Sequence, residues 1–507
     1  MRRSSPLSGR SPRLRVLAIA SEMTPWAKTG GLADVAGALP AALEALGHDI
    51  TTVIPKYRQV STGAAAVHRV PVTQGQTVRQ VDCLVRDESA LRRVVFVDAP
   101  DHFDRPGIYG EASRDYADNW QRFDLLSQAA LEYARATADD RPWDVIHLHD
   151  WQTGTAGLRL LLEERWGDLR RAGIVFTIHN LAYQGTFAKD VVPSLGLPWS
   201  AFRLELGEFW GQFSFLKSGI SSADCVTTVS PTYAEETRTP AAGVGLDGLL
   251  KSLGDRYAGI LNGIDTSVWD PASDPYLPAH FTADDLSGKR TCKRALLAAY
   301  GLPQGDDALA RPVVGMVSRL VAQKGLELIE QAMPEMIQLD ATWVFLGSGE
   351  ARYETFLRHL HASYPGRVGV RIGFDERLAH LVEAGSDIFM MPSEFEPCGL
   401  NQMYSLRYGT VPIVRAVGGL HDTIQPYTAR ALHANGFKFR EGRPDVLAHV
   451  TRRAVRLYRH PEVWRRLMRN GMAADHSWAT PAREYVKVYR RARADGAVRA
   501  RLTSAKG

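Results

Sequence analysis

The chain has 507 residues, of which 45% are hydrophobic and 23% charged; this composition is typical of a globular protein, and the length predicts two domains rather than one. Its net charge of +5 comes from the ends, because residues 1–13 carry +4, residues 481–507 carry +6 and the remainder carries −5. This distribution argues against nucleic acid as a partner, and no apolar run reaches the roughly 20 residues that span a membrane.

The first 13 residues are rich in Ser, Arg and Pro and lack the apolar segment of a secretory signal, so we predict a disordered basic tail there. The four cysteines are far apart in the sequence and form no CxxC motif. This spacing indicates neither a zinc site nor a disulfide framework, and it favours a cytoplasmic location. These cysteines are Cys83, Cys225, Cys292 and Cys398.

A glycine-containing turn follows the first predicted strand, residues 14–20, and precedes a helix that we expect to begin at Leu32. Lys28, Gly30 and Gly31 lie in this turn. Glycines allow backbone N–H groups to approach an anion, the helix N-terminus favours negative charge, and a lysine adds a positive charge suited to phosphate. The motif is neither a Walker loop nor GxGxxG, so a purely structural turn is an equal alternative.

Strands and helices alternate through the first half of the chain, which predicts a doubly wound α/β sheet. Polar groups stand at two strand ends: Asp150 follows His147 and His149, while Asn180 follows His179. Asp150, His179 and Asn180 suit hydrogen bonding to a polyhydroxyl ligand, although His179 is alternatively a core histidine satisfied by backbone. The two histidines of His147-x-His149 lack an evident third ligand, so we favour a metal-free role. The other strands predicted here are residues 48–55, 94–98, 145–150, 174–179 and 225–230.

Two further segments of the first half are distinctive. Residues 101–123 read as a long Gly/Asp/Tyr-rich loop. Residues 184–216 are rich in aromatic side chains, which stack on sugar rings in some proteins but more often belong to the core. We assign no individual aromatic residue to a site.

Residues 259–265 predict a domain junction, after which the strand–helix pattern restarts. The strands expected in this second half are residues 313–318, 343–347, 368–372, 388–391 and 411–414. The predicted organisation is a tail at residues 1–13, a first Rossmann-like domain at residues 14–258, a second at residues 259–478, and a C-terminal segment at residues 479–507.

Arg319 and Lys324 lie five residues apart after the first strand of the second half. An arginine fork and a lysine point charge suit a diphosphate, and cations at a helix start oppose the helix dipole unless an anion is present. A solvated pair is the alternative. Gly418, Gly419 and Leu420 form a second possible anion-binding turn at another strand end.

Residues 388–391 are apolar without alternation, which predicts a strand inside a parallel sheet covered on both faces. Glu394 and Glu396 follow where this strand emerges, at the edge where α/β sheets bind ligands. Taken alone, such a pair is more often a pair of solvated loop charges. Phe374 follows another strand, where it either stacks on a nucleobase or belongs to the core.

Together these stretches resemble the glycogen synthase and starch synthase family of retaining glucosyltransferases. The matching motifs occur in the family's order over residues 14–490, nearly the whole chain, and their joint match is specific although no single motif is. They are KTGGLADV (28–35), HDW (149–151), HNLAYQG (179–185), LNGID (261–265), SRL and QKG (318–325), and EPCGL (396–400).

The resemblance implies the GT-B fold, in which two Rossmann-like domains face a deep interdomain cleft and a C-terminal helix crosses back to the first domain. It implies transfer of glucose from ADP-glucose to the non-reducing end of an α-1,4-glucan with retention of configuration. It further implies that ADP-glucose is a co-substrate and that no cofactor and no metal are required.

The resemblance also assigns roles to single residues. It places Glu396 at the transferred glucose and gives Arg319 and Lys324 the nucleotide diphosphate. Asp150 and His179 complete the implied catalytic set. The remaining implied contacts to ADP-glucose are Lys28, Gly30, Gly31, Asp34, Asn262, Phe374, Cys398, Gly399, Leu400, Gly418, Gly419 and Leu420.

The sequence departs from related families at two positions. Tyr404 stands where other retaining transferases of this fold carry a second glutamate, an absence that glycogen and starch synthases share, and Glu394 stands where some members carry arginine. Two alternatives stay open: a related transferase that uses UDP-glucose or a small acceptor, and an inactive glucan-binding protein. A nicotinamide dehydrogenase is a poor third, because neither glycine-rich turn matches the dinucleotide motif.

Overall fold

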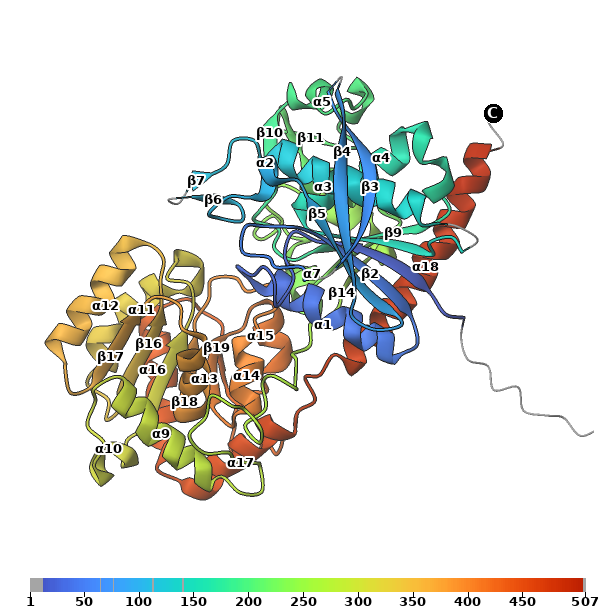
Figure 1. The fold of residues 1–507 in the computed structure, drawn as a ribbon. Helices are drawn as coiled ribbons and strands as arrows, with labels where there is room; N and C mark the ends of the chain where they lie inside the picture. Colours follow the sequence, from blue (N-terminus) through green and yellow to red (C-terminus); the bar gives the residue numbers. More distant parts are fainter. Residues whose placement is uncertain (1–11, 64, 76, 112–113, 139–140, 505–507) are drawn as a thin grey trace, which may run out of the picture. The chain divides into compact units, whose positions relative to one another are not determined.

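The computed structural model describes residues 12–63, 65–75, 77–111, 114–138 and 141–504 (Figure 1). It divides into two compact units. The first comprises the described residues up to Thr228, with Thr237–Ile260 and the segment from Trp478 onward; the second comprises Val229–Glu236 and Leu261–Ser477. Of the predicted tail, only Pro12 and Arg13 lie within the described residues.

The first unit is built on a sheet that is parallel except at one edge, where β3 pairs antiparallel with β4 and β4 pairs antiparallel with β5. Within the described residues its strand order is β14-β13-β9-β8-β1-β2-β5-β4-β3. The strands are β1 (Arg15–Ile19), β2 (Asp49–Pro55), β3 (Ala66–Gln74), β4 (Thr77–Asp87), β5 (Arg92–Asp98), β8 (Val145–His149), β9 (Gly173–Ile178), β13 (Cys225–Thr228) and β14 (Tyr257–Gly259).

All six strands predicted in the first half are confirmed, whereas β3, β4 and β14 were not predicted. The β3–β4 hairpin escaped notice because most of its residues are exposed or half-buried, so charged side chains interrupt its apolar pattern. The loop expected at residues 101–123 is wrong in part. The described residues there include α2 (Pro100–Phe103), the short pair β6 (Gly110–Glu111) and β7 (Arg114–Asp115), and the start of α3 (Asn119–Ala136).

Two groups of helices accompany this sheet. The helix predicted from Leu32 is α1 (Gly31–Ala45), which shares a buried cluster with α18 (Ala479–Ser504) through Val35, Leu39, Tyr485 and Tyr489. On this sheet α3 packs against α4 (Gly154–Leu162), and α4 packs against α6 (Phe215–Ser222). Smaller elements are α5 (Val191–Ser194), α8 (Asp247–Ser252) and a separate antiparallel sheet of β10 (Thr186–Ala188), β12 (Gln212–Ser214) and β11 (Glu208–Phe209).

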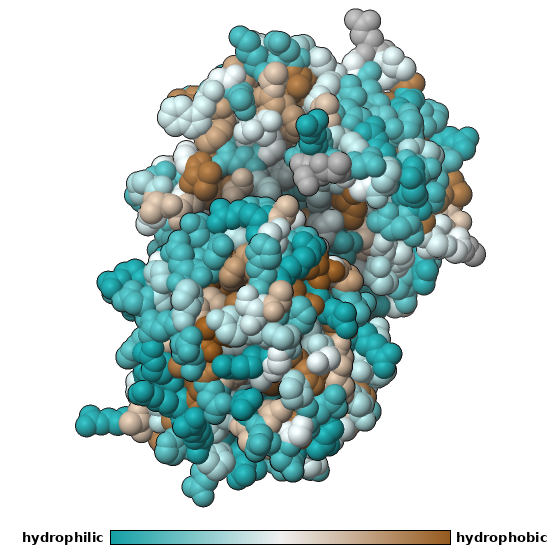
Figure 2. All heavy atoms as spheres, turned by 90° about the vertical axis from the view of Figure 1, so that its left-hand side faces the viewer, coloured by the Kyte–Doolittle hydropathy of each residue, from teal (hydrophilic) through white to brown (hydrophobic). Residues whose placement is uncertain are grey.

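The aromatic segment around this small sheet divides between core and surface. Phe213 and Phe215 are fully buried, whereas Trp199 and Trp210 are exposed. Hydrophilic residues cover most of the face shown in Figure 2, with small apolar groups between them. Within the described residues, no helix has the length and apolar character to cross a membrane.

The second unit is built on a fully parallel sheet with strand order β17-β16-β15-β18-β19-β20. The five strands predicted in this half are confirmed and β20 is additional. The strands are β15 (Val313–Val317), β16 (Thr342–Gly347), β17 (Val368–Ile372), β18 (Ile388–Met391), β19 (Val411–Arg415) and β20 (Phe437–Phe439).

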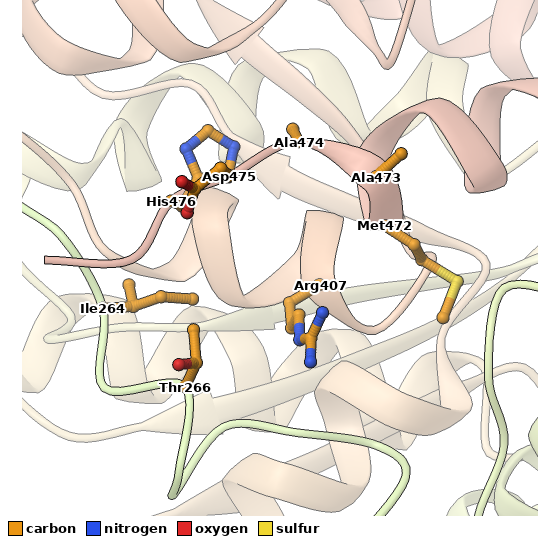
Figure 3. Close-up of a pocket in the computed structure, with 8 residues that line it drawn as sticks. All are labelled: Ile264, Thr266, Arg407, Met472, Ala473, Ala474, Asp475 and His476. Carbon is orange, nitrogen blue, oxygen red and sulfur yellow. The ribbon is translucent and has the colours of Figure 1, made fainter. Parts of the chain in front are cut away.

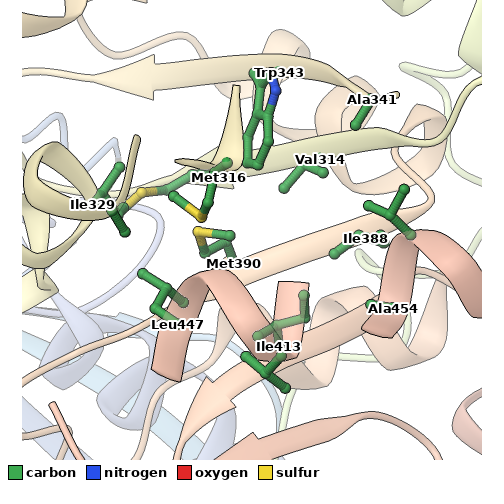
Figure 4. Close-up of a cluster of buried hydrophobic side chains, with 14 of the residues drawn as sticks. Val314, Met316, Ile329, Ala341, Trp343, Ile388, Met390, Ile413, Leu447 and Ala454 are labelled. Carbon is green, nitrogen blue, oxygen red and sulfur yellow. The ribbon is translucent and has the colours of Figure 1, made fainter. Parts of the chain in front are cut away.

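Helices cover both faces of this sheet. Alternate strand residues such as Met316, Met390 and Ile413 meet Ile329 of α11 and Leu447 of α16 in one buried cluster (Figure 4). The other face packs against α9 and α13. This arrangement confirms the central strand inferred from the unbroken apolar run at residues 388–391. The helices are α7 (Pro231–Glu236), α9 (Ser287–Ala299), α10 (Asp306–Ala310), α11 (Leu326–Met336), α12 (Ala351–Ser363), α13 (Glu376–Gly385), α14 (Asn401–Arg407), α15 (Gly418–Thr423), α16 (Pro444–Tyr458) and α17 (Pro461–Ala473).

Residues 229–236 cluster with the second unit, although the sequence analysis included them in the first domain. Within the second unit the Ser230 hydroxyl donates to the Pro397 carbonyl at 2.5 Å, and the Thr232 hydroxyl donates to Asp422 at 2.6 Å. These bonds join segments far apart in sequence, which local periodicity does not reveal.

In each sheet the order in which strands are added reverses beside the first strand. The chain runs outward from β1 to β2 and later returns to β8 on the other side of β1; likewise it runs from β15 to β16 and returns to β18. Loops that leave such a switch point diverge and open a crevice at the carboxyl ends of the strands, where α/β proteins bind ligands. Lys28 follows β1 and Asp150 follows β8 in the first unit; in the second, Lys324 follows β15 and Glu396 follows β18. Other predicted site residues follow neighbouring strands, such as His179 after β9.

Candidate functional site

The second unit brings the predicted cation and carboxylate together. Lys324 Nζ lies 2.6 Å from Glu396 Oε2, and the Ser393 hydroxyl donates to the same oxygen at 3.0 Å. Glu396 is 5% exposed and the Lys324 side chain 18%. The pair is therefore shielded from solvent enough to interact strongly, yet Lys324 still reaches the surface.

Backbone contacts fix the two loops that carry this pair. Glu394 donates its backbone N–H to the Gln323 carbonyl at 2.8 Å, and the Gln323 side chain donates to the Phe395 carbonyl at 3.2 Å. Gly325 has φ +76°, and a Cβ there would lie 2.3 Å from the Pro392 carbonyl oxygen. A glycine is thus required for the loop after β15 to approach the loop after β18.

The backbone of the predicted turn at Gly418–Leu420 packs against the loop that carries Glu396. The Gly419 N–H donates to the Glu396 carbonyl at 3.2 Å. A Cβ on Gly418, at φ +40°, would lie 1.9 Å from that carbonyl oxygen. The Gly418 N–H, expected to face a phosphate, instead donates to both carboxylate oxygens of Glu236 at 3.1 and 3.2 Å. Burial raises the pKa of Glu236 although this N–H opposes the rise.

Cys398 lies in a buried hydrophobic cluster, where its thiol is not reactive. It packs with Ile264, Met403 and Tyr404, and half-buried Leu400 lies against the same cluster. Burial raises the pKa of the Cys398 thiol to about 12, although the Asn262 backbone N–H opposes the rise. A thiol with that pKa is protonated at neutral pH and is a poor nucleophile.

Three other predicted residues of the second unit follow other strands or lie elsewhere in their loops. Arg319 is exposed, two residues after β15. Phe374 is 81% exposed after β17, which is two strands away from β15 in the sheet. Asn262 is buried, and its side-chain oxygen accepts no hydrogen bond from the described residues.

In the first unit, Asp150 occupies a strained backbone position. Its φ is +58° and its ψ −178°, which is rare for a residue other than glycine and clusters at functional sites. Its N–H donates to the Thr177 carbonyl at 2.9 Å, and its Oδ1 accepts from the His179 N–H at 3.0 Å. Burial raises the pKa of Asp150 to about 7, against the lowering effect of the His179 and Asn180 N–H groups.

Two neutral histidines adjoin Asp150. His149 Nδ1 and His179 Nε2 share a hydrogen bond of 3.0 Å across the neighbouring strands β8 and β9. Burial lowers the pKa of His149 to about 3 and holds that of His179 well below its usual range, so both rings are uncharged at pH 7. His147 is turned to other partners, the hydroxyls of Tyr489 at 2.9 Å and Thr177 at 2.6 Å.

The loop after β1 carries Lys28 to the surface. Lys28 Nζ lies 2.6 Å from Asp34, another predicted donor contact, and the two side chains are 44% and 23% exposed. Such an exposed pair contributes about 0–1 kcal/mol, so a phosphate can compete for the lysine. The Thr29 and Gly30 N–H groups donate to the buried carboxylate of Glu22.

Three residues beside the predicted ones were not predicted from the sequence: Glu22, Glu236 and Ser393. Glu22 and Ser393 each follow an apolar strand within a few residues, the same signal that drew attention to Glu396. Glu236 ends a short helix and offers no such signal.

A small pocket elsewhere in the second unit, of about 210 Å³, contains none of the predicted site residues (Figure 3). It is lined by Ile264, Thr266, Arg407, Met472, Ala473, Ala474, Asp475 and His476. We assign it no role.

The pH dependence of stability offers a test of the Asp150 environment. Its pKa rises from 3.8 to about 7 on folding, so the fold favours the protonated carboxyl. This contribution is complete below pH 3.8 and is lost as the pH rises through about 7. We expect Asp150→Asn to remove this loss of stability at high pH. The urea midpoints at about pH 5 and pH 8 should then differ less in the variant than in the wild type. Parallel midpoints for the two proteins would contradict the raised pKa.

Replacing each of two glycines with alanine is expected to affect different properties, the donor KM for Gly30 and the melting temperature for Gly418. A Cβ on Gly30 meets no other described atom within 4 Å and its φ is −159°, so Gly30→Ala should fold normally and raise the donor KM by about tenfold if the donor passes over it. Gly418→Ala should instead lower the melting temperature, because the new Cβ collides with the Glu396 carbonyl. Melting curves and donor KM values measure both, and a normal donor KM in Gly30→Ala would remove Gly30 from the site.

Models of two known protein families match the two units of the chain. The family model described as "Starch synthase catalytic domain" matches residues 15–252, and the model described as "Glycosyl transferases group 1" matches residues 305–470.

Several relatives cover nearly the whole chain. A protein named glycogen synthase from Anaeromyxobacter dehalogenans (strain 2CP-1 / ATCC BAA-258) is 49% identical over 480 residues, which is 94% of this chain and 99% of the relative. A protein of the same name from Myxococcus xanthus (strain DK1622) is 47% identical over 485 residues, again 94% of this chain and 99% of the relative.

Among solved structures, the catalytic domain of starch synthase IV from Arabidopsis thaliana, bound to ADP and acarbose, matches with a TM-score of 0.88. It is 34% identical, and the match covers 95% of this chain and 100% of that one. Sucrose-phosphate synthase from Thermosynechococcus elongatus, at 19% identity and a TM-score of 0.57, shares the fold.

Proposed function

The chain belongs to the glycogen synthase and starch synthase family of GT-B glycosyltransferases, and from this premise we propose that it transfers glucose from ADP-glucose to the non-reducing end of an α-1,4-glucan, with retention of configuration. Among this chain's own residues, the observation that best supports the proposal is the Lys324–Glu396 pair. It places a cation and a shielded carboxylate 2.6 Å apart at the switch point of the second sheet.

The proposed chemistry needs charges of both signs. Breaking the bond between glucose and the nucleotide leaves negative charge on the diphosphate and positive charge on the sugar. Lys324, with Arg319, stabilises the diphosphate, while Glu396 lies at the glucose and stabilises its cationic character. Fixed charges of this kind lower the barrier because they need no reorganisation during the reaction. A covalent glucosyl intermediate and same-face attack are both compatible with these roles.

The first unit supplies the remaining residues of the proposed mechanism. Lys28 contacts the donor from its exposed ion pair with Asp34, and Asp150 and His179 hydrogen-bond the sugar. Because His179 is neutral, it serves as a hydrogen-bonding group rather than as a charged acid. The other proposed donor contacts are Gly30, Gly31, Asp34, Asn262, Phe374, Cys398, Gly399, Leu400, Gly418, Gly419 and Leu420.

The proposed reaction requires no metal ion or other cofactor. Lys324 and Arg319 supply the positive charge that magnesium supplies to many phosphate-transfer reactions. We expect dialysis against EDTA to leave the transfer rate unchanged, and loss of activity restored by a divalent cation would contradict this proposal. We further propose a cytoplasmic location, supported by four cysteines that the structure holds as buried free thiols.

The deciding experiment is nucleotide release from ADP-glucose and from UDP-glucose, each with and without glycogen. We expect ADP-glucose with glycogen to give the highest kcat/KM and labelled glucose to enter the polymer. Preference for UDP-glucose, or for a small sugar acceptor, would favour the related-transferase alternative. Binding of glycogen without nucleotide release from either donor would show an inactive glucan-binding protein.

A further inference from the structure

Glu22 is a buried carboxylate with four hydrogen-bond donors around it. It follows β1 by three residues and is 3% exposed. Its Oε2 accepts from the backbone N–H of Thr29 and, at 3.3 Å, from that of Gly30. Its Oε1 accepts from the Thr29 hydroxyl at 2.7 Å and from the Tyr109 hydroxyl. Three of the four donors therefore belong to the loop that carries Lys28.

The carboxylate lies beneath this loop rather than on its outer face. Thr29 and Gly30 are exposed while Glu22 is buried, so the inner side of the loop is bound to Glu22 and the outer side is left for a ligand. The N–H groups that the sequence suggested for an anion are thus already used by a side chain of the same unit. Their role is to hold the loop, which leaves Lys28, the outer face of Gly30 and the start of α1 at Gly31 to meet a donor.

Glu22 is itself held in place from the opposite side. The Tyr109 hydroxyl also shares a hydrogen bond of 2.8 Å with the Ser21 hydroxyl, and the Tyr109 carbonyl accepts from the Asn119 side chain at 2.9 Å. The Tyr57 hydroxyl donates to the Ser21 carbonyl at 2.8 Å. The loop is thereby linked through Glu22 to segments up to about a hundred residues away in sequence, which gives it one orientation.

The bonding pattern depends on the shape of the side chain more than on its charge. All four contacts are neutral N–H or O–H groups, and two of them are hydroxyls that can also accept a hydrogen bond. A glutamine can therefore replace Glu22 with its oxygen toward the backbone N–H groups and its NH₂ toward the hydroxyls. An alanine leaves every one of the four groups without this partner.

We propose that Glu22 is a positioning residue for glucosyl transfer, which holds the Lys28–Gly31 loop in the orientation that receives the nucleotide sugar. The proposal rests on the function proposed above. Misplacement of a binding group by about 1 Å costs up to about 100-fold in rate, so the loss of Glu22 should be visible in the donor kinetics.

The kinetic test compares Glu22→Ala, Glu22→Gln and Thr29→Val. We expect Glu22→Ala to lower kcat/KM for ADP-glucose by about 10- to 100-fold, mostly through the donor KM, and to leave the KM for glycogen unchanged. Glu22→Gln should stay within about threefold of the wild type, and Thr29→Val, which removes one bond of the four, should lie between them. A folded Glu22→Ala with wild-type donor kinetics, or a Glu22→Gln as impaired as Glu22→Ala, would overturn the proposal.

Hydrogen exchange tests the contact without using activity. In the full-length wild-type protein we expect the Thr29 and Gly30 amides to exchange slowly although both residues are exposed, to stay protected in Glu22→Gln, and to lose protection in Glu22→Ala. Fast exchange in the wild type would overturn the proposal whatever the enzyme transfers. Protected amides in a wild type that transfers no glucose would instead contradict only the function proposed above.

Discussion

Replacing Lys324 with methionine is expected to lower kcat for glucosyl transfer by about 10²–10³-fold, the size of effect seen when one fixed charge-stabilising group is removed from an active site. Methionine keeps most of the side-chain volume, so the change is mainly one of charge. The expected cause is loss of the cation that stabilises the departing diphosphate. Steady-state kinetics with ADP-glucose and glycogen measure it, with Lys487→Met, at an exposed ion pair on α18, as the control that should behave as the wild type.

Stability must be separated from chemistry in this experiment. Without Lys324, the buried Glu396 carboxylate keeps the Ser393 hydroxyl but has lost its charged partner, so Lys324→Met should also unfold at a lower temperature. Adding Glu396→Gln removes the unpaired charge. The double variant should regain the melting temperature and remain inactive. A folded Lys324→Met with wild-type kcat would remove Lys324 from the catalytic group.

Truncating Arg159 to alanine is expected to lower the free energy of unfolding of the first unit by about 3–5 kcal/mol, the usual cost of breaking a buried ion pair by removing one partner. The Arg159 guanidinium donates through Nε and Nη2 to the two oxygens of Asp124 at 2.9 and 2.8 Å, and both side chains are 2% exposed. It also pairs with Glu163 and donates to the Leu195 carbonyl at 2.8 Å. The variant leaves the Asp124 carboxylate buried without its cation, whereas Glu163 keeps Arg165 at 2.6 Å.

The control for Arg159 is an arginine pair on the surface. Arg69 contacts Asp82 through Nε and Nη2 at 2.7 and 3.1 Å, but the Arg69 side chain is 65% exposed. Arg69→Ala should therefore change stability by less than about 1 kcal/mol. Urea unfolding followed by far-UV circular dichroism compares the two variants. Equal effects would show that burial does not control the strength of these pairs.

Much of the candidate site was predictable because each residue carries a local signal. Lys324 and Glu396 each follow an apolar run that ends abruptly, and Asp150 follows another. The position of a strand end is encoded in a short stretch of sequence, and parallel sheets place such ends at one edge. The predictions at these positions needed no knowledge of which strand neighbours which.

Other parts of the site lacked such a signal. The partner of the Gly418 N–H is Glu236, which lies 182 residues away, and a hydrogen bond over that separation leaves no periodic trace in the sequence. The β3–β4 hairpin was missed for a different reason: its exposed face tolerates charged residues, so the alternation that marks a strand is blurred.

The two-part α/β organisation and the polar residues at the strand ends can be read from the amino-acid sequence, because hydrophobic periodicity and turn residues are local properties. Which of those residues meet depends on how the strands are ordered in space. The contact between Lys324 and Glu396 exists because β18 lies beside β15, although two strands intervene in the sequence, and the Tyr109 hydroxyl reaches Glu22 across a separation of 87 residues. Strand order and hydrogen-bond partners follow from the packing of the whole chain, which no single stretch of it encodes.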